Sequence, residues 1–143
     1  MKASLLVRTA SVLAFVHAVL HTIGGVFGRV AAGPATIAVT AMKANQFAAF
    51  GNQRTFWEFY TGLGLAITIF LVMDSIVLWL LAPLVMSYPK QIRPVLVAFA
   101  IGYLVFAVVS FRFFFLGPVV VEFLIMVCLI AAVATNPPVT TQQ

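Results

Sequence analysis

Four long stretches of the chain are almost entirely apolar, and each has about the length that a helix needs to cross a bilayer. They cover residues 4–27, 56–82, 94–110 and 114–134. A membrane-spanning helix needs about 20 such residues, and these stretches lack the alternating pattern of membrane β-strands. Because lipid offers no hydrogen-bond partners, only helices and closed barrels cross it. The pattern predicts a single all-α domain, an integral membrane four-helix bundle.

The long connection between the first two stretches carries a helical pattern of its own. Gly33-Pro34 precedes this pattern and Gly51 follows it, which is typical of helix boundaries. Apolar residues recur at helical spacing between them: Val39, Met42, Phe47 and Phe50. We therefore predict a short amphipathic helix over about residues 35–50, lying on the bilayer surface or capping the bundle.

Composition agrees with a membrane protein. The chain is 64% hydrophobic and 8% charged, against about 45–50% and 25% in soluble domains. The net charge of +5 comes from scattered basic residues at the ends of the apolar stretches, as expected for anchors to anionic headgroups. They include Lys2, Arg29, Lys43, Arg54, Lys90 and Arg93. We expect membrane lipids as partners and no nucleic acid.

The direction of insertion rests on a balanced count of basic residues. Four lie on the side of the N-terminus and four on the side of the long connection. Short loops weigh more in the positive-inside rule, so we predict that both termini are cytoplasmic. We also expect the first stretch to stay as a span, because no small-residue cleavage site directly follows it.

Several polar side chains are predicted to lie at one depth in the membrane. With a rise of about 1.5 Å per residue, four of them fall roughly 8–13 Å below the face that carries the long connection, and three lie near that face. The seven candidate ligand-binding residues are His17, His21, Glu58, Tyr60, Tyr103, Arg112 and Glu122. Charged groups at such depth are costly, so their convergence predicts a functional site.

His17 and His21 are four residues apart and share a helix face. They suit a metal site with Glu122 or Glu58 as oxygen ligands, a proton relay, or a polar anchor for a lipophilic ligand. They equally suit hydrogen bonds that hold neighbouring helices together. No motif supports haem, and the sequence names no cofactor.

Other candidates have structural interpretations. Thr55 and Glu58 form the pattern of a capping box, and Tyr60 suits an interfacial anchor. Arg112 either meets headgroups or forms a salt bridge to Glu122 or Glu58. Two glycine pairs, Gly24 with Gly28 and Gly62 with Gly64, would let helices approach closely.

Arg8 and Asp74 fall at a second depth, both roughly 26 Å from the long-connection face. Opposite charges at one depth predict a structural ion pair. Arg8 points about 180° away from His17 around its helix, so one flat interface cannot serve both clusters. Either the helices cross steeply, or one cluster faces another neighbour such as a second subunit.

Two segments resemble a group of uncharacterised bacterial four-span membrane proteins. The first is Arg54-Thr-Phe-Trp-Glu-Phe-Tyr-Thr-Gly-Leu-Gly-Leu65, preceded by His21-Thr22 at the close of the first span, and the second is Arg112-Phe-Phe-Phe-Leu-Gly-Pro118. The architecture is also similar to DoxX-like and sterol-isomerase-like bundles, some of which handle quinones or sterols. The resemblance implies a fold and transfers no catalytic residues; we expect the bacterial cytoplasmic (inner) membrane.

These observations lead to three functional hypotheses. The first is binding of a lipophilic small molecule (a quinone, an isoprenoid or a lipid) in a polar pocket in the long-connection half of the bundle. The second is a non-catalytic accessory subunit of a homo-oligomer or larger membrane complex. The third is an intramembrane isomerase or metal-dependent oxidoreductase, which needs a carboxylate–histidine pair at a cavity.

Overall fold

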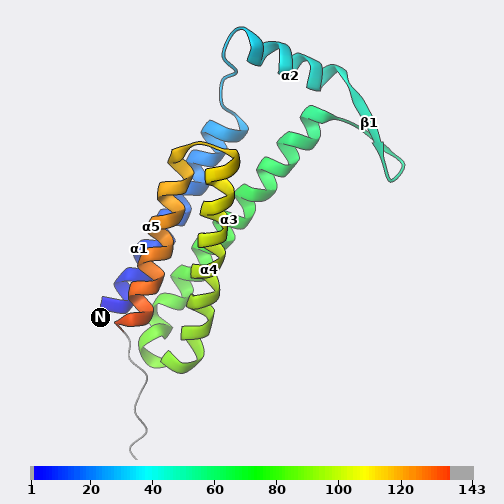
Figure 1. The fold of residues 1–143 in the computed structure, drawn as a ribbon. Helices are drawn as coiled ribbons and strands as arrows, with labels where there is room; N and C mark the ends of the chain where they lie inside the picture. The colour runs from blue at the N-terminus through cyan, green and yellow to red at the C-terminus, as the bar shows by residue number, and fades with distance from the viewer. Residues whose placement is uncertain (1, 136–143) are drawn as a thin grey trace, which may run out of the picture. The chain divides into compact units, whose positions relative to one another are not determined.

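The computed structural model describes residues 2–135 (Figure 1). Four helical segments within them are long and apolar enough to cross a membrane, which confirms an all-α, multi-pass membrane protein. The long elements are α1 (Lys2–Leu20) with its π-helical continuation η1 (His21–Val26), α3 (Phe56–Ser87), α4 (Pro89–Phe113) and α5 (Leu116–Ala134). The connection after η1 holds α2 (Pro34–Ala44), β1 (Gln46–Ala49) and β2 (Asn52–Thr55).

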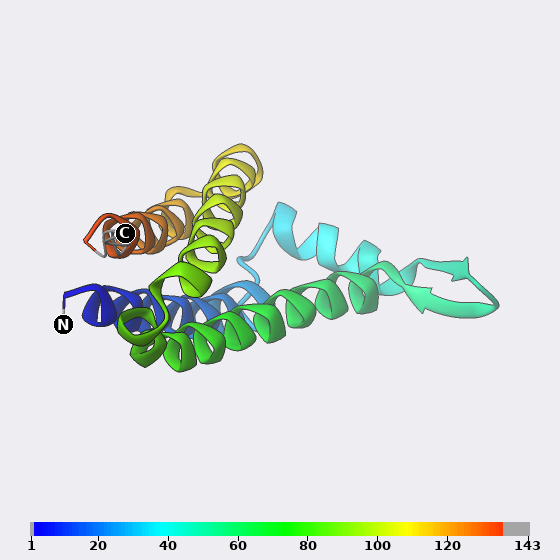
Figure 2. The ribbon, with the colours of Figure 1, turned by 90° about the horizontal axis from the view of Figure 1, so that it is seen from below.

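The chain forms two compact units. Among the described residues, the bundle unit contains residues 2–17 and 71–135, and the hairpin unit is Ala18–Phe70. In the bundle unit, parts of α1 and α3 and the whole of α4 and α5 run alternately up and down (Figures 1 and 2). This unit is therefore an antiparallel bundle of four helices.

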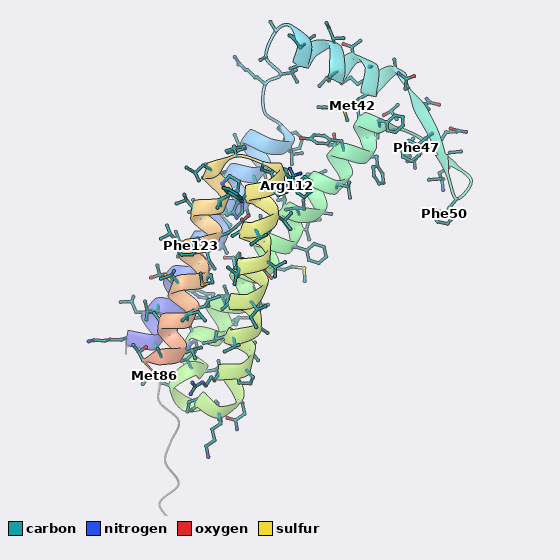
Figure 3. The ribbon with its side chains drawn as sticks, viewed as in Figure 1. Met42, Phe47, Phe50, Met86, Arg112 and Phe123 are labelled. Atoms are coloured by element: carbon teal, nitrogen blue, oxygen red, sulfur yellow. The ribbon has the colours of Figure 1, made fainter. Side chains whose placement is uncertain are left out.

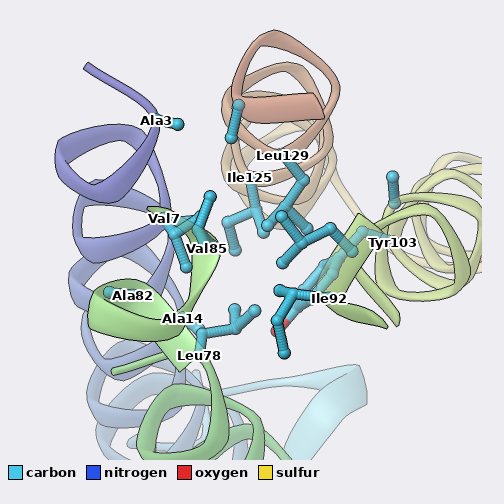
Figure 4. Packing of buried hydrophobic residues seen from close by; sticks show 14 residues of the cluster. Ala3, Val7, Ala14, Leu78, Ala82, Val85, Ile92, Tyr103, Ile125 and Leu129 are labelled. Atoms are coloured by element: carbon cyan, nitrogen blue, oxygen red, sulfur yellow. The ribbon is translucent and has the colours of Figure 1, made fainter. Parts of the chain in front are cut away.

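Small residues on α1 allow its neighbours in the bundle to approach closely. Ala3, Val7, Ala10 and Ala14 recur at helical spacing and are buried. They share one apolar core with Leu78, Ala82 and Val85 of α3 and with Ile125, Leu129 and Ala132 of α5 (Figure 4). Lipid tails are as apolar as these side chains, so close packing rather than exclusion from water stabilises the core.

The turn between α3 and α4 is tighter than predicted. The second span was expected to end near Pro83 and the third to begin at Pro94, yet both prolines lie inside helices. Tyr88 alone separates α3 from α4, and its backbone N–H donates to the Leu84 carbonyl at 2.8 Å. Prolines are tolerated in membrane helices because neighbouring groups compensate for the lost hydrogen bond.

The connection between α4 and α5 is also short. The predicted spans 94–110 and 114–134 become Pro89–Phe113 and Leu116–Ala134. A Cβ atom on Gly117 would lie 2.9 Å from the ring of Phe115, so glycine lets that ring fold over the first turn of α5. The two helices follow each other as closely as the predicted spans do, with shifted ends.

In the hairpin unit, the predicted amphipathic helix is shorter than expected, with 11 residues. It ends at Ala44, and Asn45 is extended. Residues 46–55 form an antiparallel β-hairpin in which Ala49 pairs with Asn52, so helical spacing was the wrong interpretation of Phe47 and Phe50. The ring of Phe47 packs 5.0 Å from that of Phe56 and 5.5 Å from that of Phe59 (centroid distances), which fixes β1 against the start of α3 (Figure 3).

Candidate functional site

One predicted cluster forms within the core of the bundle unit. Glu122 of α5 is 0% exposed and His17 of α1 is 6% exposed. The Nε2 atom of His17 lies 3.8 Å from Oε1 of Glu122, and the hydroxyl of Ser110 donates to the same oxygen at 2.9 Å. The ring of Phe106 stacks on His17 with centroids 6.0 Å apart. The structure therefore brings His17 and Glu122 together, as the shared depth predicted.

This cluster is chemically suited to hold a proton. A protonated imidazole and a carboxylate at this distance attract each other in a low-dielectric core. Oε2 of Glu122 has no hydrogen-bond partner within residues 2–135. The donor to Oε1, Ser110, was not singled out from the sequence. Its signal was its position seven residues after Tyr103, on the same face of α4.

Tyr103 belongs to a different cluster from the one predicted. Its hydroxyl donates to Oδ2 of Asp74 at 3.2 Å. The predicted depths of these two residues differed by about 14 Å, because depth on α3 was counted from Phe56. With 32 residues, α3 is about 48 Å long against a hydrocarbon core of about 30 Å, so Phe56 is a poor reference point.

Asp74 does not form the predicted ion pair with Arg8. The guanidinium of Arg8 lies 5.2 Å from the centroid of the Trp79 ring, and within the described part of the chain no ion pair joins Arg8 to Asp74. The cation–π contact lets Arg8 pack its long side chain along an exposed apolar surface. Asp74 therefore interacts with the Tyr103 hydroxyl instead of Arg8, and its side chain also borders an open space.

That space is a groove of about 600 Å³ along α4 in the bundle unit. Asp74 of α3 and Tyr103 supply its polar side chains, and the rest of the lining is apolar and comes from α4. The apolar lining residues are Ala98, Phe99, Gly102, Val105, Phe106 and Val109. Gly102 has open space where a Cβ would lie, so its missing side chain widens the groove. Phe106 lines the groove and also stacks on His17.

His21 has the structural role that was one of its several interpretations, a hydrogen bond between neighbouring helices. Its Nε2 atom lies 3.0 Å from the carbonyl oxygen of Gly64 on α3, and the hydroxyls of Thr22 and Thr68 are 2.9 Å apart. These contacts join the two helix ends of the hairpin unit. Within residues 2–135 no three His, Cys, Asp or Glu side chains gather to hold a metal, so the His17–His21–Glu122 metal set is not assembled.

The candidates near the long connection also make local contacts. Glu58 and Thr55 form the capping box: the Thr55 N–H donates to Oε2 of Glu58 at 2.7 Å, and the Glu58 N–H donates to the Thr55 hydroxyl at 3.1 Å. Tyr60 stacks on Trp57 with centroids 5.7 Å apart. Arg112 lies 5.6 Å from the centroid of Phe113 and forms no ion pair with either glutamate among residues 2–135.

The Asp74–Tyr103 contact had a signal in the sequence that was not used. Two antiparallel helices joined by a tight turn place residues at equal distances from the turn side by side. Asp74 comes 14 residues before Tyr88 and Tyr103 comes 15 residues after it, as their numbers show. Comparison with known proteins adds nothing to this geometry: no family model, no curated protein and no solved structure matches the chain.

Proposed function

We propose that this membrane protein binds a lipophilic small molecule in the groove along α4, with Asp74 and Tyr103 holding its polar group. The observation that carries the proposal is a groove of about 600 Å³ whose lining is apolar except for one hydrogen-bonded carboxyl–phenol pair. Ligand sites are typically concave, about 300–1,000 Å³ in volume and mostly apolar, with a few polar groups that fix orientation. The volume and the lining of the groove fit these criteria, and the groove is open along its side rather than enclosed.

The depth of the pair supports a ligand that dissolves in the bilayer. Asp74 lies 13 residues before Ser87, where α3 ends, and this corresponds to about 20 Å along the helix. A carboxyl group at such depth is costly, and such groups generally mark a functional site. A lipophilic molecule would reach this depth by partitioning into the membrane, as a quinone, an isoprenoid or a lipid does.

The other two hypotheses have less support. The His17–Glu122 pair is the arrangement that an intramembrane acid–base enzyme would use, yet neither residue lines the groove. The accessory-subunit hypothesis drew on the facing of Arg8, which the contact with Trp79 accounts for within this chain. We further propose a location in the bacterial inner membrane with both termini cytoplasmic. This direction follows from the positive-inside rule, in which basic residues in short loops count most.

The test is identification of lipophilic compounds that co-purify with the protein. Gly102→Leu would fill the groove from a position with open space for the side chain, and Gly62→Leu makes the same change on α3 at another open position. We expect mass spectrometry to find a compound enriched over bulk lipid in the wild type and in Gly62→Leu, and lost from Gly102→Leu. The same compounds at the same level in all three proteins would refute the proposal.

A further inference from the structure

The side-chain polar atoms that the groove offers to a ligand are hydrogen-bond acceptors. The single hydroxyl hydrogen of Tyr103 is already donated to Oδ2 of Asp74. With Asp74 ionised, the remaining sites are Oδ1 of Asp74 and the lone pairs of the phenol oxygen, all of them acceptors. The other lining residues are Ala, Phe, Gly and Val, which carry no side-chain donor. A ligand that satisfies this site must therefore bring donors of its own.

The charge of the site points the same way. Within residues 2–135, Tyr103 is the one residue that hydrogen-bonds to the Asp74 side chain, and no Lys, Arg or His forms an ion pair with it. A carboxylate at membrane depth without a cation is costly, and a positive charge beside it offsets that cost. Phe99 and Phe106 line the same groove, and aromatic faces attract cations.

We propose that the groove selects lipophilic amines, with the ammonium group donating to Asp74 and the apolar part lying along α4. This rests on the proposed function and narrows its ligand class. The amine binds as its ammonium ion and Asp74 as the carboxylate, so the N–H donors of the ligand meet the acceptors of the site. A quinone fits less well, because its carbonyl oxygens are acceptors that would face further acceptors.

Three probes with one skeleton separate these chemistries: 4-phenylbutylamine, 4-phenylbutanol and 4-phenylbutyrate. Binding is measured as displacement of radiolabelled 4-phenylbutylamine from the full-length protein in nanodiscs of a zwitterionic lipid, with empty nanodiscs subtracted. We expect the unlabelled amine to displace the label and the alcohol and the acid to do so at least about tenfold more weakly, because hydrogen bonds to charged groups are the strong ones.

Four variants test the residues of the groove. Asp74→Asn keeps the shape and removes the charge, so amine affinity should fall about tenfold or more, whereas Asp74→Glu keeps the charge and should retain binding. Gly102→Leu should abolish binding, and Gly62→Leu should not. Only variants with the circular dichroism spectrum of the wild type and a single symmetric peak in gel filtration are compared. If Asp74→Asn does not fold, binding by Asp74→Glu tests whether a carboxylate at this position is sufficient.

The outcomes separate this proposal from the proposed function. If the alcohol or the acid displaces the label as well as the amine does, or if Asp74→Asn binds the amine normally, selection of amines is refuted. Loss of binding in Gly102→Leu would then still support the groove as a site. If none of the probes shows binding that depends on Gly102, but a co-purified compound without an amino group does, selection of amines fails and the groove remains a ligand site. If no compound depends on Gly102, both proposals fail.

Discussion

Gly62 and Gly64 lie two residues apart on α3 but have different surroundings. A Cβ atom on Gly64 would lie 2.8 Å from Cγ2 of Val26, whereas one on Gly62 would meet nothing within 4 Å. The carbonyl of Gly64 also meets the His21 ring, with 3.0 Å between the oxygen and Nε2. Gly64 therefore allows two helix ends of the hairpin unit to approach until a side chain can reach a backbone carbonyl. Of the two, only Gly64 has the close-approach role predicted for both.

The two glycines give a matched pair of alanine substitutions. Gly64→Ala should lower the free energy of unfolding by about 1–3 kcal/mol because the new methyl group crowds Val26. Gly62→Ala should raise it by about 0.5–1 kcal/mol through helix propensity. The measurement is reversible unfolding in mixed micelles of mild detergent and dodecyl sulfate. Adding Val26→Ala to Gly64→Ala should recover part of the loss; equal effects of the two single substitutions would contradict the close approach.

Individual polar contacts were only partly predictable. His17 and Glu122 were predicted at one depth because each lies close to the long-connection end of its apolar stretch. Over such a short distance, the number of residues gives a reliable depth. Asp74 was assigned to Arg8 because opposite charges were assumed to pair, whereas Arg8 uses the Trp79 ring and Asp74 uses the Tyr103 hydroxyl. Sequence distance from the nearest tight turn is the better guide, because the turn sets the register of antiparallel helices.

At the scale of elements, the β-hairpin is the feature that the hydrophobic pattern missed. Residues at positions 47 and 50 fit a helical period, but Phe50 and Gly51 have φ angles of 48° and 81° and form a two-residue turn. Positive φ at both positions is typical of a type I′ hairpin turn, where Asn-Gly is preferred. Phe at the first position hides that signal. The long helices were predictable because lipid enforces them; the connection is free of that constraint.

Phe50→Asn should stabilise the hairpin. A bulky residue in the left-handed region costs about 1–2 kcal/mol, and asparagine tolerates that region better. We expect slower hydrogen exchange at the paired amides of β1 and β2 in Phe50→Asn and faster exchange in Phe50→Val. The exposed side chain of Phe50 at the tip (Figure 3) makes few contacts that the change would lose. Unchanged exchange in both variants would show that the turn does not limit the hairpin.

For the whole molecule, the number of spans is better determined than their direction. Four membrane-length helices place the turn at Tyr88 and the β-hairpin at opposite ends of α3. Composition and length fixed this topology. The balanced distribution of basic residues left the direction to the positive-inside rule alone.

Labelling of single cysteines tests both points. In a Cys128→Ala background, Asn52→Cys and Gln91→Cys each place one thiol at an exposed position, on β2 and on α4. With cytoplasmic termini, a membrane-impermeant maleimide should label Asn52→Cys in right-side-out vesicles and Gln91→Cys in inside-out vesicles. A reversed pattern would contradict the proposed direction, and labelling of both from one side would contradict the topology.

The groove along α4 has a consequence for how affinity at this site should be expressed. Several of its lining residues, among them Gly102, Val105 and Val109, are exposed on the flank of a membrane-length helix. Molecules dissolved in the bilayer would thus enter sideways, without crossing water. Partitioning has then already enriched them, so a weak intrinsic interaction suffices for high occupancy. Occupancy should follow the mole fraction of the compound in the lipid, and diluting the vesicle lipid with inert phospholipid should empty the site even at constant total concentration.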